Sequence, residues 1–95
     1  MFKDEYHPQV KKDLKNIDKS VQRDIKENHI PSILNNPYKG KELKGDLSGI
    51  YSYSFRKEKV SYRISYIIYE KKQVIYFLKI GKREKFYEIL KRRIS

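Results

Sequence analysis

The chain has 95 residues, of which 38% are hydrophobic, 37% charged and 14% aromatic, and it contains no cysteine. This length is typical of one small domain, here residues 1–95, with one modest core, and the lack of cysteine excludes disulfides, thiolate zinc sites and iron–sulfur clusters. Lys and Arg outnumber Asp and Glu by 23 to 12, so the net charge is +11 and favours an anionic partner.

The first residues have the pattern of a short strand followed by an amphipathic helix. Residues 2–6 are predicted to form the strand. Over residues 7–17 one apolar face recurs at intervals of four, four and three residues, which is helical spacing. These positions are Tyr6, Val10, Leu14 and Ile17.

A second helix is predicted to begin after Asp18, whose side chain can cap it. Its core positions are Val21, Ile25 and either Ile33 or Leu34. Pro31 is expected to kink or break this helix near residues 29–30, because proline removes a backbone hydrogen bond. Residues 35–40 are predicted to be a loop, so the two helices form a hairpin.

The second half of the chain changes to strand periodicity. Residues 50–56 and 60–69 alternate between two faces, and residues 74–80 are apolar on both faces, as in a central strand. Short polar turns separate the three strands, which predicts an antiparallel meander. Gly81 is expected to end the third strand, and helical spacing over residues 82–94 predicts a short basic C-terminal helix.

These elements predict an α+β fold, with the helical hairpin packed on one face of a twisted antiparallel sheet of three to four strands. The apolar face of the sheet takes Tyr51, Tyr53, Phe55, Tyr62, Ile64, Tyr66 and Ile68. The opposite, polar face takes Ser52, Ser54, Arg56, Ser61, Arg63 and Ser65.

The positive charge is concentrated in the strand-rich half. Residues 56–95 hold 13 Lys and Arg against 4 Asp and Glu, a net of +9, whereas residues 1–55 hold 10 against 8, a net of +2. A polar and basic sheet face favours binding to nucleic acid or to an acidic protein. A solvated basic surface is the alternative.

Several kinds of catalytic site are poorly supported by the sequence. The two histidines, His7 and His29, lie in the helical half, away from clustered acidic residues, so we expect packing roles for them and no metal site. A Ser-His-Asp arrangement and a glycine-rich phosphate loop are not supported. Arg, Lys and Tyr remain, and they are suited to RNA cleavage by the substrate's own 2′-hydroxyl, which needs positioning and charge stabilisation. The same residues would equally suit a binding site without turnover.

Four segments, taken in order, resemble the RelE/ParE superfamily of toxins from toxin–antitoxin systems, and are most similar to RelE-type mRNA interferases. They are the helical N-terminal half, residues 43–49 leading into a strand, the strand segment 61–66 (SYRISY) and the segment 80–87 (IGKREKFY). The resemblance implies a RelE-like fold and a ribosome-dependent mRNA endoribonuclease that inhibits translation without a metal or other cofactor.

The resemblance also implies site residues. Arg63 and Arg83 would stabilise the phosphate and the transition state, and Tyr87 would orient or stack on the nucleotide. Further substrate or phosphate contacts are expected from Arg56, Lys57, Lys59, Lys82, Lys85, Ser52 and Ser54. The family carries strand lysines, proposed as the general base, where this chain has Ser52 and Ser54, and a serine hydroxyl is a poor base near neutral pH.

Two other functions remain open at this point. ParE-like members inhibit DNA gyrase as binders and do not cut RNA, and a toxin that only binds its antitoxin is the third reading. The resemblance implies an acidic, RelB-like antitoxin as partner, besides ribosome and mRNA, and a toxin–antitoxin hetero-oligomer. No apolar run reaches the length of a membrane span and no secretory signal is evident, so we expect a cytoplasmic protein without a membrane partner.

Overall fold

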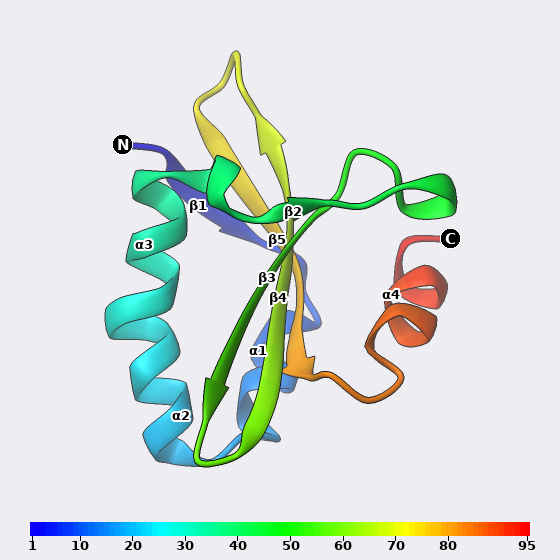
Figure 1. Ribbon diagram of the computed structural model, residues 1–95. Helices are drawn as coiled ribbons and strands as arrows, with labels where there is room; N and C mark the ends of the chain where they lie inside the picture. Colours follow the sequence, from blue (N-terminus) through cyan, green and yellow to red (C-terminus); the bar gives the residue numbers. More distant parts are fainter.

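A five-stranded mixed sheet forms the centre of the computed structural model, which describes residues 1–95 (Figure 1). The strands lie in the order β1-β5-β4-β3-β2. Their bounds are β1 (Lys3–Tyr6), β2 (Lys41–Glu42), β3 (Tyr51–Lys57), β4 (Val60–Tyr69) and β5 (Val74–Lys82). The predicted meander is therefore present as β3, β4 and β5, and the predicted α+β class is confirmed.

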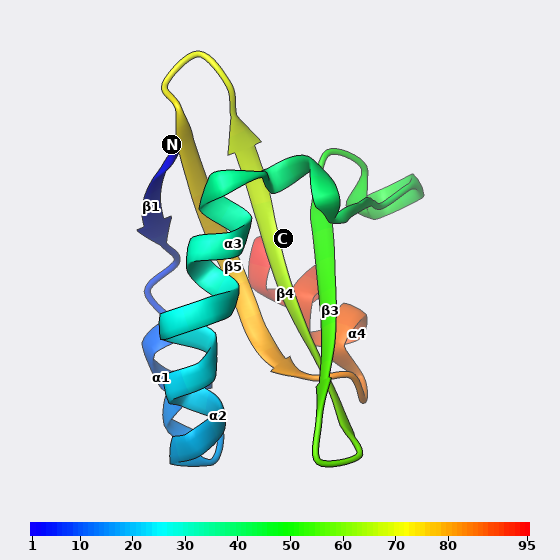
Figure 2. The same cartoon turned by 60° about the vertical axis from the view of Figure 1, so that its left-hand side comes forward.

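The sheet differs from the prediction at its two edges. β1 pairs with β5 in parallel, and the two-residue β2 pairs with β3, so the sheet has five strands and is not wholly antiparallel. After β1 the chain passes through the helices to the opposite edge of the sheet, and β1 is left beside the last strand (Figure 2). Four exposed residues with no alternating pattern could not reveal that direction.

The helices lie on both faces of the sheet. The helical hairpin consists of α1 (Val10–Lys15), α2 (Lys19–Asp24) and α3 (Ile30–Asn35), and α4 (Phe86–Ile94) lies on the other face (Figures 1 and 2). Short 3-10 turns cover Pro37–Lys39 and Gly45–Leu47. None of these helices combines the length and the apolar character that crossing a membrane requires.

Pro31 does not break the second helix as predicted. A π-helical turn, Ile25–His29, joins α2 to α3, and the Ile30 N–H donates to the Ile25 carbonyl one residue further back than in an α-helix. Pro31 then falls in the first turn of α3, where its missing N–H is tolerated. The wider turn thus absorbs the proline, and the helix runs on to Asn35.

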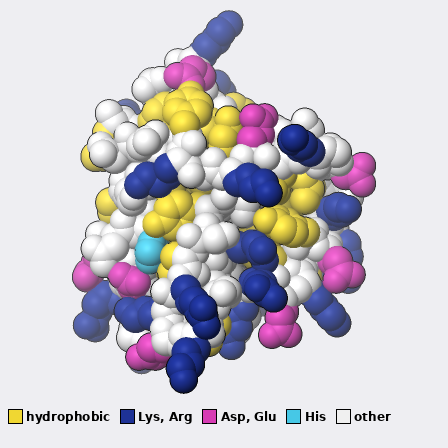
Figure 3. Space-filling view, viewed as in Figure 1, with side chains coloured by type: hydrophobic (Ala, Val, Ile, Leu, Met, Phe, Trp, Pro, Cys, Tyr) yellow, Lys and Arg dark blue, Asp and Glu magenta, His cyan; other side chains and the backbone are white.

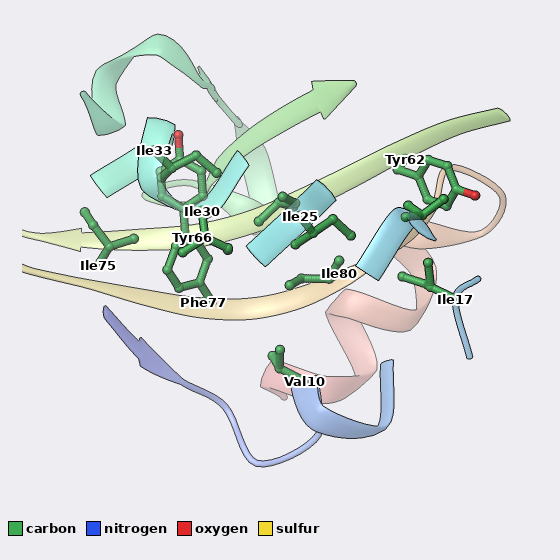
Figure 4. Packing of buried hydrophobic residues seen from close by; sticks show 12 residues of the cluster. Val10, Ile17, Ile25, Ile30, Ile33, Tyr62, Tyr66, Ile75, Phe77 and Ile80 are labelled. Carbon is green, nitrogen blue, oxygen red and sulfur yellow. The ribbon is translucent and has the colours of Figure 1, made fainter. Parts of the chain in front are cut away.

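The main core lies between the helical hairpin and the sheet (Figure 4). The sheet contributes Tyr62, Ile64, Tyr66, Ile75, Phe77 and Ile80, and the helical half contributes Val10, Ile17, Val21, Ile25, Ile30 and Ile33. Most of these positions were predicted by the helical and strand periodicities, with Ile33 chosen over the half-buried Leu34. Tyr6, which was predicted to face the core, is exposed, and Ile30 is a core residue that was not predicted.

A β-bulge in β5 supports a second, smaller core beneath α4. Ser65 pairs with Lys79 but Tyr66 pairs with Phe77, so Leu78 is an extra residue in β5. Leu78 and Lys79 therefore both face α4. Leu78 packs with Leu47, Ile50, Phe86 and Leu90.

Gly40 lies where a larger residue would disturb the core. A Cβ at this position would collide with the hydroxyl of buried Tyr66, which donates to the Pro37 carbonyl at 2.7 Å. Burial raises the pKa of Tyr66 to about 12, so the hydroxyl keeps its proton and remains a donor.

We expect Gly40→Ala to lower the free energy of unfolding by about 1–3 kcal/mol, the usual cost of overpacking, measured by urea denaturation. Adding Tyr66→Phe removes the colliding oxygen, so the double variant should be more stable than the sum of the two single effects predicts. Strict additivity would contradict this account of Gly40.

Candidate functional site

The sheet face turned away from the helical hairpin, called the outer face below, is only partly open. α4 and residues 43–50 cover one part of it, and Ser52 and Ser65 are buried there. Ser54, Arg56, Ser61 and Arg63 lie on the uncovered part, towards the turn between β3 and β4. The predicted polar face therefore exists, but only its half near this turn is accessible.

Arg63 is at the centre of the uncovered part. It lies on β4 between Ser54 of β3 and Gly81 of β5, and Gly81 leaves the space beside it free of a side chain. Its Cζ is 4.9 Å from the centre of the Tyr87 ring, and its Nη1 donates to the Arg83 carbonyl at 3.2 Å. Arg63 thus contacts the Tyr87 ring and the Arg83 backbone, both from the segment that follows β5.

Tyr87 is held from below by a buried serine. Its hydroxyl donates to Ser52 Oγ at 3.1 Å, and its ring meets the Phe86 ring edge to face. Ser52 is 6% exposed, so this bond is shielded from water. The phenol is therefore fixed in orientation, with Arg63 stacked on its ring.

The Tyr87–Ser52 bond gives a direct test of this arrangement. Tyr87→Phe and Ser52→Ala each remove the same hydrogen bond, so each should lower the free energy of unfolding by about 0.5–1.5 kcal/mol. The double variant should lose scarcely more than one single variant, because the second change finds no bond left to break. Thermal unfolding of all four proteins measures the coupling, and full additivity would show that the bond does not form.

Two adjoining clefts open beside these residues. The first, called the Arg63 cleft, has a volume of about 360 Å³ and is lined by Ser54, Arg56, Ser61, Arg63 and Arg83, among others. The second, called the turn cleft, has a volume of about 400 Å³ and is lined by Arg56, Lys59, Val60, Ser61, Lys82, Arg83 and Glu84. Arg56, Ser61 and Arg83 line both, so the clefts form one basic surface.

The space-filling view shows Lys and Arg side chains running from the middle of the molecule to its lower end, where the turn between β3 and β4 lies (Figures 1 and 3).

A larger cavity of about 550 Å³ lies elsewhere, between β1, α1 and the helices that follow. Its lining is mostly apolar, with Tyr6, Val10 and Leu14 among its residues, so it offers little to an anion.

An ion-pair cluster anchors the far end of α4. Arg93 donates to both carboxylate oxygens of Asp13, at 2.7 and 2.9 Å, and also to the Leu78 carbonyl. Lys79 lies 3.9 Å from the same carboxylate, and burial lowers the pKa of Lys79. The helix that carries Tyr87 is thereby tied to α1 and β5.

Not every predicted site residue reaches the clefts. Lys57 points to the other face of the sheet, where its Nζ is 3.7 Å from Asp24, because it is one residue out of phase with Arg56. Ser52 lies beneath Tyr87 and not at the surface, and Lys85 is exposed just before α4 without lining either cleft. The remaining predicted residues, Arg63, Arg83, Tyr87, Arg56, Lys59, Lys82 and Ser54, lie at or beside the clefts.

Ser61 and Glu84 also line the turn cleft, although no site role was predicted for either residue. The strand register could have indicated Ser61, since it faces Arg56 directly across β3 and β4. His29 packs between the hairpin and β3, stacked on Phe55 and bonded to Tyr53, in keeping with its expected packing role. No group of three or more His, Asp or Glu is placed to hold a metal ion.

Comparisons with known proteins agree with this architecture. Residues 5–91 match the model of a family described as the ParE-like toxin of type II bacterial toxin–antitoxin systems. A mutant of Escherichia coli toxin RelE in the free state is 21% identical, with a TM-score of 0.76 over 99% of this chain and 98% of that chain. The comparison with curated proteins found no match.

Two solved toxin–antitoxin complexes also contain similar chains. One from the E. coli RelBE complex is 20% identical, with a TM-score of 0.72 over 88% of this chain and 99% of that chain. One from the Mycobacterium tuberculosis RelBE2 complex is 20% identical, with a TM-score of 0.72 over 86% of this chain and 98% of that chain. At these identities the likeness shows a shared fold, so the predicted RelE-like fold is confirmed.

Proposed function

Because the chain belongs to the ParE-like toxin family of type II bacterial toxin–antitoxin systems, within the RelE/ParE superfamily, we propose that it is a toxin that cuts mRNA on the ribosome. The observation that supports this most is that Arg63 and Arg83 line the same open, basic cleft, with the Tyr87 ring against Arg63. Guanidinium groups match phosphate oxygens in geometry and charge.

The proposed reaction uses the 2′-oxygen of the RNA as nucleophile. A bond forms from that oxygen to the phosphorus and the bond to the 5′-oxygen breaks, which leaves a 2′,3′-cyclic phosphate and a 5′-hydroxyl. Arg63 and Arg83 would stabilise the extra negative charge of the pentacoordinate transition state. The Tyr87 ring, fixed through Ser52, would orient the nucleotide.

Two protons must move in this reaction, one from the 2′-hydroxyl and one to the leaving 5′-oxygen. The hydroxyl of Ser52 is buried and that of Ser54 is a poor base, so neither replaces the lysine of the family's strand. The titratable groups lining the turn cleft besides the arginines are Lys59, Lys82 and Glu84. For an RNA strand lying in the clefts, these three groups are therefore the nearest titratable candidates for the two proton transfers.

An antitoxin partner is the second part of the proposal. The solved E. coli and M. tuberculosis structures are complexes of a toxin with its antitoxin. The net charge of +11 suits an acidic segment that folds on binding and neutralises the cations that would meet phosphate. Co-expression with an acidic reading frame beside this gene should give a stable complex and restore growth. If both proteins were soluble but purified separately, with no complex between them, this part of the proposal would be contradicted.

Gyrase inhibition without RNA cleavage is the alternative function. Serines in place of the family's strand lysines favour it, because a binder needs no general base, and the matched family is described as ParE-like. A toxin that only binds its antitoxin is the remaining reading.

Primer extension on a message translated in vitro tests the proposal. The protein should produce new 5′ ends on translated mRNA and none on the same RNA without ribosomes, whereas gyrase supercoiling in a parallel reaction should be unchanged. Intact transcripts together with blocked supercoiling would replace the proposed function by the alternative. Intact transcripts with normal supercoiling would favour a toxin that only binds its antitoxin.

A further inference from the structure

The residues of the two clefts form two rows across the outer face. The first row is Ser54, Arg63 and Gly81, which pair directly across β3, β4 and β5. In the second row Arg56 pairs with Ser61, whose carbonyl accepts the Arg83 N–H at 3.0 Å. Residues 61 and 63 are two positions apart on β4, so the rows are separated by about 6.8 Å. Arg63 of the first row lines only the Arg63 cleft, whereas Arg56 and Arg83 line both clefts.

The turn cleft contains positive charge that no carboxylate of the protein neutralises by an ion pair. Arg56, Lys59, Lys82 and Arg83 line it, and none of them forms an ion pair within the protein. Other cations on neighbouring elements do find carboxylates, as Lys57 does with Asp24. Glu84 at the rim is the only carboxylate in the lining. An unpaired group of this kind is suited to an anion from outside.

The backbone conformation of the turn between β3 and β4 also bears on the turn cleft, because Lys59 belongs to both. Glu58 and Lys59 have φ angles of 51° and 70°, the left-handed conformation that a two-residue hairpin turn requires at both positions. Asn and Gly are the residues preferred there, and other side chains are strained. The turn therefore holds Lys59 beside the turn cleft in a conformation that glycine would adopt with less strain.

From these observations we propose that the turn cleft is a second phosphate subsite, next to the one formed by Arg63 and Arg83. The ligand is a single-stranded RNA laid along β4, with one phosphate at the Arg63 cleft and the neighbouring phosphate held by Arg56, Lys59 and Lys82. This rests on the proposed function. It adds that the protein requires at least two consecutive phosphates and that the strand continues towards the β3–β4 turn.

The salt dependence of RNA binding tests the subsite. A 2′-O-methyl RNA hexamer cannot be cut at its blocked oxygens, so its affinity can be measured at several salt concentrations. Each phosphate contact contributes about 0.7 to the slope of log K against log salt for a single strand. Arg56→Gln with Lys59→Gln should therefore reduce the slope by about 0.7 or more. A second hexamer carries a neutral methylphosphonate in place of the phosphate that the turn cleft would hold. With this hexamer the slope of the wild-type protein should fall by the same amount.

Lys71→Gln with Lys72→Gln is the matched control, because it removes the same charge from exposed positions in the turn at the opposite end of β4. Its slope should stay close to that of the wild type. A slope unaffected by Arg56→Gln with Lys59→Gln, or lowered equally by the control, would overturn the subsite. Cleavage of translated mRNA by the wild type is measured separately, so loss of the subsite and loss of the proposed function give different results.

Lys59→Gly separates a role in binding from a role in folding. Glycine relieves the strained φ angle, so the melting temperature should rise by about 4 °C, while the salt slope for the hexamer falls. If Lys59 served the fold, the same change would lower the melting temperature and leave the slope unchanged. That pair of results would contradict the proposal.

Discussion

Replacing Arg63 with alanine is expected to slow cleavage of translated mRNA by about 10²–10³, the usual effect of removing one preorganised donor from a transition state. Arg63 is held against the Tyr87 ring and the Arg83 carbonyl before any ligand arrives, so it needs no reorganisation to meet a phosphate. The rate is measured by primer extension at saturating protein, so that weaker binding does not determine the result.

Stability measurements separate this effect from unfolding. The Arg63 Nε is buried and makes no hydrogen bond within the protein, which is a cost to the folded state that a purely structural arginine would not carry. Arg63→Met should therefore leave the melting temperature unchanged or raise it slightly while cleavage is lost. Arg23→Ala, which removes an exposed arginine from α2 on the other side of the sheet, is the control and should cut normally. Cleavage by Arg63→Met at the wild-type rate would contradict the assigned role.

The parts of the fold that could be predicted are those with a strong local pattern. The strict alternation of Tyr51, Tyr53 and Phe55 fixed one face of β3, and the core confirms it. The parallel pairing of β1 depends on how the chain crosses the hairpin, which no local pattern encodes. The π-helical turn that accommodates Pro31 is likewise not encoded in the spacing of apolar residues. Both features therefore fall outside what periodicity can show.

The positions of the predicted site residues could be foreseen to a similar extent. Arg63 and Arg83 followed from the order of the segments that resemble the RelE/ParE superfamily, and in the structure both line the Arg63 cleft. Ser52 and Lys57 failed as surface contacts for different reasons. The position of α4 over the sheet buries Ser52, and the phase of β3 turns Lys57 towards Asp24. Strand phase was available from the sequence, whereas the path of the C-terminal helix across the outer face was not.

Asp13→Ala is expected to lower the free energy of unfolding by about 3–5 kcal/mol, since breaking a buried ion pair leaves an uncompensated charge. The Asp13 side chain is 8% exposed and accepts both bonds from Arg93, whose side chain is 10% exposed. It also accepts the backbone N–H of Ile80 at 3.0 Å, beyond the point where β1 stops pairing with β5. Removing the carboxylate therefore leaves Lys79 and one strand N–H without a partner, and leaves Arg93 only the Leu78 carbonyl. Urea denaturation measures the loss.

Two further variants show whether the ion pair itself is responsible. Asp18 lies at the N-cap of α2, but its side chain does not form the predicted capping bond. Asp18→Ala therefore removes an exposed carboxylate from the same hairpin and should change stability by less than about 0.5 kcal/mol. Asp13→Leu with Arg93→Leu replaces both charges by apolar groups and should lose less than Asp13→Ala alone. Because α4 also carries Tyr87, Asp13→Ala should weaken the Tyr87–Ser52 bond. The effect should be visible as faster hydrogen exchange over residues 86–94, measured at temperatures well below the melting temperature. Unchanged exchange in α4 would mean that the Asp13–Arg93 pair does not anchor the helix.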